Sequence, residues 1–343
     1  MQNGQMVRVA IFGVSGFVGG ELLRFCAAHP RLRPARLFGH SQAGARVADV
    51  HPHLALAYGH ATVERFDGGV LRDVDLVFAA LPHGESQAIA PGIVERGIPF
   101  VDLGADFRLR DPAEYQLWYG EPHHAPELLD RFVYGIPEIN RDAIRASRCV
   151  AAAGCYPTAT ILALKPLVDA GLIETGSIVV DASSGVSGAG RAAKEATAFN
   201  TVSESLSAYG LLNHRHTAEM QAVLGGDILF TPHLAPMNRG ILATCYGAAS
   251  RAMSAGEPLE VLRASYKDEP FVRASDQAPA TKWTLGSNAA QVTARYDERT
   301  GRIVAIAAID NLGKGAAGQM IQCANLMLGL DEAAGLPTCG VYP

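Results

Sequence analysis

Residues 7–30, VRVAIFGVSGFVGGELLRFCAAHP, set the architecture of the first half of the chain. They start with a short apolar run, Val7–Phe12, typical of a buried strand, and continue as an amphipathic helical pattern. Between the two, Gly13, Gly16 and Gly19 have a GxxGxxG spacing. Without side chains, the first two let backbone N–H groups approach a pyrophosphate at the helix start, and the third lets helix and strand pack closely. The stretch predicts a dinucleotide site.

Further strands and helices alternate up to about residue 150. Apolar runs at 35–38, 74–80 and 98–103 read as strands, and helical patterns separate them. Such alternation predicts an α/β fold with a doubly wound, parallel, Rossmann-type sheet. Ligands of such sheets bind beyond the carboxyl ends of the strands, where we expect Pro82, His83, Gly84 and Arg108.

The loop after the second strand, GHSQAGARV, bears on cofactor choice. NAD-specific folds usually place Asp or Glu here, on the ribose hydroxyls. This loop has His40, Ser41 and Arg46 instead, so a hydroxyl and a guanidinium are available for a 2′-phosphate. The loop favours NADP, although a plain polar surface loop would look similar.

The segment AAGCYPTA, residues 152–159, places Cys155 between a short apolar strand and a helical pattern that runs to Gly171. We expect Pro157 and Thr158 to open the helix. Free N–H groups and the positive end of the helix dipole favour thiolate over thiol, as a nucleophile requires. The alternative is a small buried cysteine at a tight turn.

Residues from about 151 have a different pattern. A strand-like run at 177–181 is followed by further runs at 228–250 and 291–309, and only one helical pattern, 257–266, lies between the last two, which predicts an α+β domain with a mixed or antiparallel sheet. We assign residues 151–312 to a catalytic and dimerisation domain, and 1–150 to the nucleotide domain, completed by a C-terminal helix within 313–343. The Ser/Gly-rich loop before Arg191 either presents donors to an anion or is a flexible turn.

Two histidine clusters need separate interpretations. His214 and His216 flank Arg215 just before a helical pattern. His123 and His124 are adjacent, so their side chains diverge, and we expect no metal there. They fall within 111–146, a segment rich in Pro, His and charge in which YGIPEIN reads as an ordered loop.

Composition narrows the class of protein. With 343 residues, 48% hydrophobic and 18% charged, the chain is long enough for two domains with large cores. A net charge of -5 gives no support for a nucleic-acid partner. The six cysteines form no CxxC pair, and neither a signal-peptide layout nor an apolar run of about 18 residues is present. We therefore expect a cytoplasmic protein without a membrane partner.

Taken together, these segments resemble the N-acetyl-gamma-glutamyl-phosphate reductase family, NADP-dependent enzymes of arginine biosynthesis related to aspartate-semialdehyde dehydrogenases. The similarity runs from about residue 7 to 330 through GVSGFVGGELLR, SQAGARVADVHP, LPHGES, DLGADFRL, YGIPEINR, AAGCYPTA, SSGVSGAGR, NHRHTAEM and DNLGKGAAGQMIQ. One departure is Ala218, where the family is expected to have proline before the glutamate.

The resemblance implies roles for individual residues. Cys155 matches the nucleophile and His216 the acid/base, with His214 the less favoured choice. Arg108 matches an arginine that meets the phosphate, and Arg191 and Arg215 are weaker candidates for the substrate anion. Cofactor-binding residues are then Gly13, Ser15, Gly16, Phe17, Val18 and Gly19 at the pyrophosphate, Ser41 and Arg46 at the 2′-phosphate, and Gly313 and Gly315 on the nicotinamide side.

The implied reaction is reduction of an acyl phosphate through a Cys155 thioester, in a homo-oligomer, dimer or tetramer. A small-molecule acyl phosphate is thus the expected partner, and the reaction needs no metal. Two alternatives stay open: a related reductase acting on aspartyl phosphate or on a lysine-pathway acyl phosphate, and a cysteine acyltransferase or hydrolase without redox chemistry. The GVSGFVG segment argues against the non-redox alternative.

Overall fold

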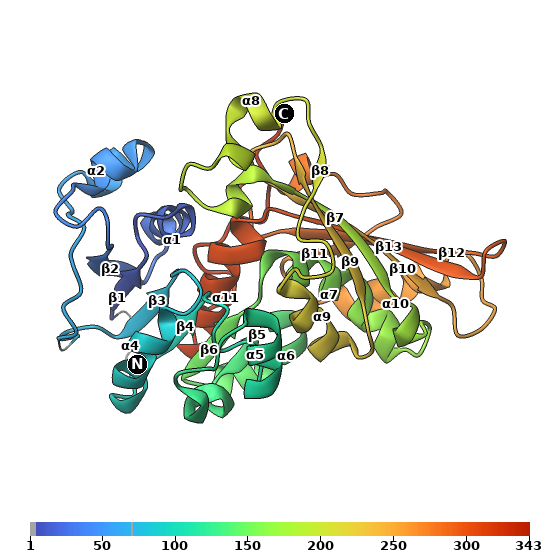
Figure 1. Cartoon of the computed structure of the whole chain (residues 1–343), viewed down its shortest axis with the longest axis horizontal. Helices are drawn as coiled ribbons and strands as arrows, with labels where there is room; N and C mark the ends of the chain where they lie inside the picture. Colours follow the sequence, from blue (N-terminus) through green and yellow to red (C-terminus); the bar gives the residue numbers. More distant parts are fainter. Residues whose placement is uncertain (1–4, 70) are drawn as a thin grey trace. The chain divides into compact units, whose positions relative to one another are not determined.

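The structure is a computed structural model that describes residues 5–69 and 71–343. The chain divides into two compact units (Figure 1). Unit 1 comprises residues 1–153 and 316–336, and unit 2 comprises residues 154–315 and 337–343.

Unit 1 is built on a parallel sheet of strand order β2-β1-β3-β4-β6-β5. Its strands are β1 (Val7–Phe12), β2 (Leu32–Phe38), β3 (Leu76–Ala79), β4 (Phe100–Asp102), β5 (Val133–Gly135) and β6 (Cys149–Ala152). Its helices are α1 (Phe17–Ala28), α2 (Val47–Val50), α3 (Ala55–Tyr58), α4 (Ser86–Glu95), α5 (Pro112–Tyr119), α6 (Pro137–Ala146) and α11 (Gly318–Met327). The predicted parallel α/β architecture is confirmed.

The central strands of this sheet, β3, β4 and β6, are buried along their whole length and are apolar apart from Asp102 at the end of β4. One core cluster joins Phe12, Val77 and Phe100 of the sheet with Ala90 and Ile93 of α4. The last helix, α11, packs on β4, β5 and β6 although it comes almost 170 residues after β6 begins.

Unit 2 is built on a mixed sheet of order β11-β12-β13-β10-β7-β9-β8. The strands are β7 (Val179–Gly185), β8 (Ser207–Ala208), β9 (Leu229–Ala235), β10 (Ile241–Ala248), β11 (Val272–Ala274), β12 (Ala290–Asp297) and β13 (Arg302–Ile309). The helices are α7 (Cys155–Asp169), α8 (Phe199–Val202), α9 (His216–Leu224) and α10 (Glu257–Tyr266). β7 pairs antiparallel with β10 but parallel with β9, so the predicted mixed sheet is confirmed.

Helices α7 and α10 pack on one face of this sheet (Figure 1). On β10, Ile241, Ala243 and Cys245 are buried, whereas Leu242 and Tyr246 on the other face are half-buried or exposed. This alternation is the signature of a sheet with one covered face.

Three local predictions were wrong. YGIPEIN, residues 134–140, is the end of β5 and the start of α6 and not a loop; segment 111–146 also contains α5 and a 3-10 turn at Pro126–Arg131. Strand β7 continues through Ser183 and Ser184 to Gly185, so the Ser/Gly segment is half strand and then a 3-10 turn, Val186–Ala189. Helix α7 starts at Cys155 itself, with Pro157 already inside its first turn.

Candidate active site

The glycine loop of unit 1 is built for close packing around the start of α1. Gly13 has φ +77°, and a Cβ there would lie 2.2 Å from the Ala80 carbonyl oxygen. A Cβ on Gly19 would lie 2.4 Å from the Gly13 carbonyl oxygen. Side chains at these two positions are therefore excluded, and the chain turns tightly from β1 into α1.

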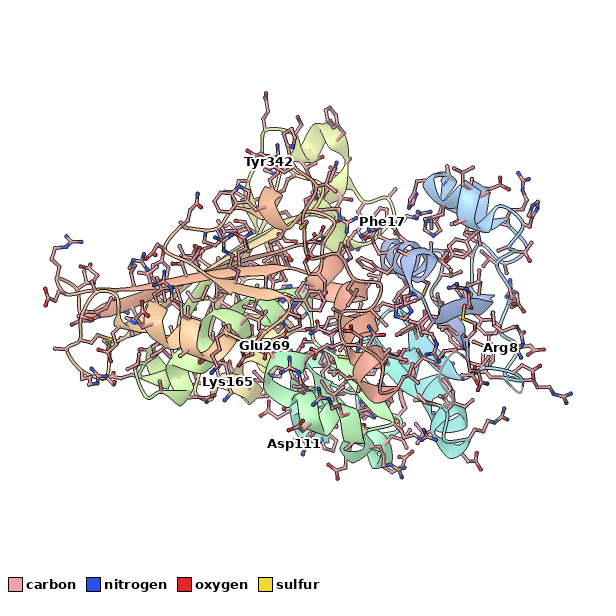
Figure 2. All side chains as sticks on the ribbon, turned by 180° about the vertical axis from the view of Figure 1, so that it is seen from behind. Arg8, Phe17, Asp111, Lys165, Glu269 and Tyr342 are labelled. Carbon is pink, nitrogen blue, oxygen red and sulfur yellow. The ribbon has the colours of Figure 1, made fainter. Side chains whose placement is uncertain are left out.

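The start of α1 is suited to an anion. Gly16 is its N-cap, and within the described residues no side chain caps the helix and no acidic residue lies in its first turn. Ser15, Phe17 and Val18 are half-buried at this turn, and Phe17 is labelled beside α1 in Figure 2. Backbone N–H groups and the positive dipole end here fit a pyrophosphate.

The loop after β2 carries Ser41 and Arg46, both exposed. The Arg46 guanidinium donates to both carboxylate oxygens of Asp49, with Nε–Oδ2 2.9 Å and Nη2–Oδ1 2.7 Å. A 2′-phosphate that binds Arg46 at this loop therefore has to share the guanidinium with Asp49 or displace the Asp49 carboxylate.

In unit 2, Cys155 is the first residue of α7, and Gly154 is its extended N-cap. The Gly154 carbonyl oxygen accepts from both the N–H and the hydroxyl of Thr158, at 2.9 Å each. The Gly154 N–H donates to Glu219 Oε2 at 2.9 Å. The backbone that presents Cys155 is thus fixed from both sides, with the thiol partly exposed at a helix start.

His216 begins α9 and faces the same carboxylate. Its Nε2 lies 3.9 Å from Glu219 Oε1, while Glu219 Oε2 holds the Gly154 amide. The Glu219 side chain is fully buried, and the His216 side chain is 19% exposed. One carboxylate therefore connects the residue before Cys155, the candidate nucleophile, with the acid/base candidate.

His214 has a different environment from His216. Its Nδ1 accepts the backbone N–H of His216 at 3.2 Å, which supports the start of α9. Its ring packs edge-on against Tyr156, Tyr209 and Phe230, with centroids 5.3 to 5.6 Å apart. Burial, assisted by the neighbouring Arg215 charge, lowers the pKa of His214 to about 4. A neutral His214 that accepts at Nδ1 is a support for His216 and a poor proton donor.

The tyrosine after the nucleophile belongs to the same cluster. The Tyr156 hydroxyl donates to the His233 carbonyl oxygen at 3.0 Å, and Tyr209 donates to the Tyr156 hydroxyl at 3.1 Å. Burial raises the pKa of Tyr156 well above its usual range and that of Tyr209 to about 12. Both hydroxyls stay protonated near neutral pH.

The glycines of the DNLGKG segment pack against this site from the other side. A Cβ on Gly315 would lie 2.8 Å from Cys155 Cβ, and one on Gly313 would lie 2.1 Å from the Ser287 carbonyl oxygen. Buried Asp310 holds the turn, because its carboxylate accepts the N–H groups of Leu312 and Gly313 and pairs with Arg239.

The candidate anion-binding arginines are divided between the units. Arg108 of unit 1 is buried to 9% exposure and donates from Nη2 to the Leu103 carbonyl oxygen. Arg191 and Arg215 of unit 2 are exposed, the first after the 3-10 turn Val186–Ala189 and the second at the N-cap of α9. Unit 1 therefore contains the glycine loop and Arg108, and unit 2 contains Cys155, His216 and the other two arginines.

Sequence reasoning missed Glu219, which contacts both parts of the unit 2 site. Its signal was available, because a glutamate three residues after His216 lies on the same face of a helix. The contact of Glu219 with Gly154 could not be predicted from the sequence, since 65 residues separate the two. Within residues 5–69 and 71–343, no cluster of three or more His, Cys, Asp or Glu side chains forms a potential metal site. The same residues include no helix long and apolar enough to cross a membrane.

Two family models match this chain, and the boundary between them lies near residue 150, as does the first boundary between the two units. The family model described as semialdehyde dehydrogenase, NAD binding domain, matches residues 8–147. The model described as semialdehyde dehydrogenase, dimerisation domain, matches residues 155–311.

Solved structures show the same fold at low sequence identity. Aspartate semialdehyde dehydrogenase II from Vibrio cholerae superposes with a TM-score of 0.72 over 95% of this chain and 99% of that one, at 19% identity. Aspartate semialdehyde dehydrogenase with NADP from Candida albicans gives a TM-score of 0.70 over 94% of this chain and 99% of that one, at 15% identity.

Curated relatives match far more closely in sequence. N-acetyl-gamma-glutamyl-phosphate reductase of Desulforudis audaxviator is 46% identical, and that of Geobacillus kaustophilus 43% identical, each across 98% of this chain and 100% of the relative. The enzyme of the same name from Halorhodospira halophila is 45% identical over the same shares. Nearly full-length identity at this level, on a semialdehyde dehydrogenase fold with a cysteine at the start of α7, places the chain in the N-acetyl-gamma-glutamyl-phosphate reductase family.

Proposed function

We propose that the protein reduces N-acetyl-glutamyl 5-phosphate with NADPH to N-acetyl-glutamate 5-semialdehyde and phosphate, a step of arginine biosynthesis. The observation that carries the proposal is the joint placement of Cys155, Gly154, Glu219 and His216 in unit 2. Family membership supports the substrate, because relatives of 41–46% identity carry this enzyme's name.

In the proposed reaction the Cys155 thiolate attacks the acyl carbon, and the carbon–oxygen bond to phosphate breaks to leave a thioester. NADPH, when bound, supplies the hydride that reduces this thioester. The resulting thiohemiacetal on Cys155 collapses to aldehyde and thiolate, and His216 takes or gives the proton at each stage. Glu219 stabilises the charged imidazole between these stages.

The cofactor proposal rests on the glycine loop of unit 1. The packed Gly13 and Gly19 and the open start of α1 fit a dinucleotide pyrophosphate. Ser41 and Arg46 support NADP over NAD at the 2′-phosphate. Arg108 is assigned to the substrate phosphate, with Arg191 and Arg215 as further anion contacts.

We also propose that the protein is a cytoplasmic homo-oligomer that assembles through the uncovered face of the mixed sheet. The match of residues 155–311 to a dimerisation domain supports the assembly, as do the half-exposed Leu242 and Tyr246 on that face. The six cysteines, all among the described residues, are free, which suits a reducing compartment.

The test is a steady-state assay in the reverse direction with N-acetylglutamate semialdehyde, phosphate and either NADP or NAD. We expect turnover with NADP, little with aspartate semialdehyde, and none with Cys155→Ser, whose hydroxyl is a far weaker nucleophile. NADP binding by Cys155→Ser should survive, because the glycine loop belongs to unit 1. Preference for aspartate semialdehyde would favour the related reductase, and thioester chemistry without nucleotide reduction would favour the acyltransferase alternative.

A further inference from the structure

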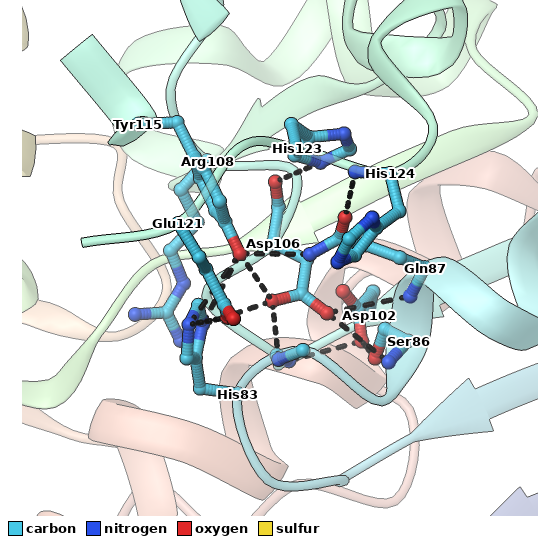
Figure 3. Close-up of polar contacts among 12 residues, drawn as sticks. His83, Ser86, Gln87, Asp102, Asp106, Arg108, Tyr115, Glu121, His123 and His124 are labelled. Carbon is cyan, nitrogen blue, oxygen red and sulfur yellow. Dashed lines mark hydrogen bonds and ion pairs between the residues drawn. The ribbon is translucent and has the colours of Figure 1, made fainter. Parts of the chain in front are cut away.

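His83, in the loop between β3 and α4, lies between two carboxylates (Figure 3). Its Nδ1 is 3.1 Å from Asp106 Oδ1, and its Nε2 is 3.1 Å from Glu121 Oε1. Asp106 belongs to the loop after β4, and Glu121 follows α5. Three segments of unit 1 therefore meet at one imidazole ring.

Each ring nitrogen thus faces a carboxylate oxygen, and the Tyr115 hydroxyl also lies 3.4 Å from Nδ1. A neutral imidazole donates from one nitrogen only, and its other nitrogen would turn a lone pair toward a carboxylate oxygen. The ring also stacks on Tyr119, with centroids 4.4 Å apart and planes at 28°, and only 19% of the side chain is exposed. The electron-rich face of tyrosine favours a cation.

Asp106 is the centre of the contacts that His83 completes. Its buried carboxylate accepts the N–H groups of Gly84 at 2.8 Å, Ser86 at 3.1 Å and Gln87 at 3.3 Å, all at the start of α4. The His123 ring donates to its backbone carbonyl oxygen at 2.8 Å. The side chain and the backbone carbonyl of Asp106 are thus both held in place. Asp106 lies in the loop 104–108, two residues before Arg108.

A second buried acid, Asp102, shares a partner with Asp106. Ser86 donates its hydroxyl to Asp102 Oδ1 at 2.7 Å while its N–H goes to Asp106. Burial, and secondarily the charge of Asp106, raise the pKa of Asp102 to about 7. Of the two buried acids, Asp106 is the one that faces the His83 ring, whereas Asp102 accepts from Ser86 and Gly104.

We propose that His83, held as an imidazolium between Asp106 and Glu121, is a positioning residue that fastens the Arg108 loop to the start of α4. The role rests on the proposed function, in which Arg108 binds the phosphate. A neutral side chain at position 83 removes the compensating charge from buried Asp106 and loosens the loop that presents Arg108.

Kinetics in the reverse direction test the consequence for phosphate. His83→Gln keeps a donor but removes the charge, and should raise KM for inorganic phosphate about tenfold, with kcat changed less than about threefold and KM for NADP unchanged. Glu121→Gln, at the exposed end of the contact, should raise KM for phosphate about threefold. The double variant should resemble His83→Gln, because both changes act through one ring.

His124→Gln is the matched control, since it makes the same substitution at an exposed histidine of the same cluster and should change nothing. An unchanged KM for phosphate in His83→Gln, or additive effects in the double variant, would overturn the positioning role. Absence of reverse turnover in the wild-type protein would instead refute the proposed function.

The charge on His83 has its own readout, independent of turnover. Nitrogen-15 NMR of the full chain, with the His83 signals identified by their loss in His83→Gln, should show both ring nitrogens protonated at about pH 7. A neutral tautomer in the wild type at about pH 7 would overturn the proposal whatever the kinetics show.

Discussion

At the scale of single residues, His214 and His216 show how two histidines of one loop take different roles. His216 faces the buried Glu219 carboxylate, with 3.9 Å between Nε2 and Oε1. His214 accepts the His216 amide and packs against three aromatic rings. The resemblance pointed to His216, and these contacts supply a physical reason for that choice.

We expect His216→Asn to lower kcat about 10²–10⁴-fold, because asparagine cannot carry a proton between steps. Substrate KM should change far less, since the arginines still hold the anion. His214→Asn should keep most of its kcat. Steady-state rates of the two variants show which histidine is the acid/base. A large loss of kcat in His214→Asn with little loss in His216→Asn would assign the role to His214.

His214 also predicts a pH dependence of stability. Its pKa is about 4 in the folded protein against 6.5 unfolded, so below pH 6.5 the unfolded chain binds more protons and stability falls. Between about pH 7.5 and 5 the loss is up to about 2 kcal/mol, less any relief from solvent at this partly exposed ring. Urea unfolding should show a smaller loss in His214→Phe than in the wild type, because His29 and His123, whose pKa values are also lowered by burial, are present in both proteins. Equal pH dependence in both proteins would remove His214 as the cause.

At the scale of elements, the start of α7 and the turn before α11 form one packed arrangement around Cys155. Gly315→Ala would place a Cβ 2.8 Å from Cys155 Cβ and 3.3 Å from the Asp310 carbonyl oxygen. A shift of the nucleophile by about 1 Å costs about 10²-fold in rate, so kcat/KM should fall by that order. Gly176→Ala is the control, because no described atom lies within 4 Å of its added Cβ. Full activity in Gly315→Ala would show that Cys155 tolerates displacement.

The loop between β2 and α2 predicts cofactor choice. Ser41→Asp should weaken NADP relative to NAD by on the order of 2–3 kcal/mol, since a carboxylate would face the 2′-phosphate. Asp49→Asn should act in the opposite direction, because it releases Arg46 from its present partner. KM values for both nucleotides test the pair. Equal shifts for NADP and NAD would place the 2′-phosphate elsewhere.

Elements with strong local patterns were predictable from the sequence. Val7–Phe12 and Glu257–Tyr266 have the predicted bounds, because apolar periodicity and turn residues define them locally. Strand β5 was missed, since its three residues are a strand only through pairing with β6. The Asp106 contacts were equally hidden, because they join segments about 20 residues apart. The position of Cys155 at a helix start was predictable from the sequence, whereas its neighbour's contact with Glu219 depends on tertiary structure.

At the scale of the whole molecule, the uncovered face of the mixed sheet predicts self-association. Leu242→Asp places a charge on that face and should shift the protein toward monomer, because burying an unpaired carboxylate is costly. Leu56→Asp, at a fully exposed leucine of unit 1, is the control. Sedimentation velocity over a range of concentrations measures both. A wild-type monomer at every concentration, or unchanged association in Leu242→Asp, would contradict assembly through this face.

The Glu219 carboxylate, shared between the Gly154 amide and His216, limits how this sequence can drift or be redesigned. A substitution at 219 alters the backbone before the nucleophile and the basicity of the histidine at once, so neither is adjustable alone. The segments GCYPTA and HRHTAE, although 60 residues apart, should therefore change together in evolution and have to be transferred together in protein design. An engineer who grafts the cysteine helix onto another scaffold without its glutamate partner should obtain a thiol and no reductase.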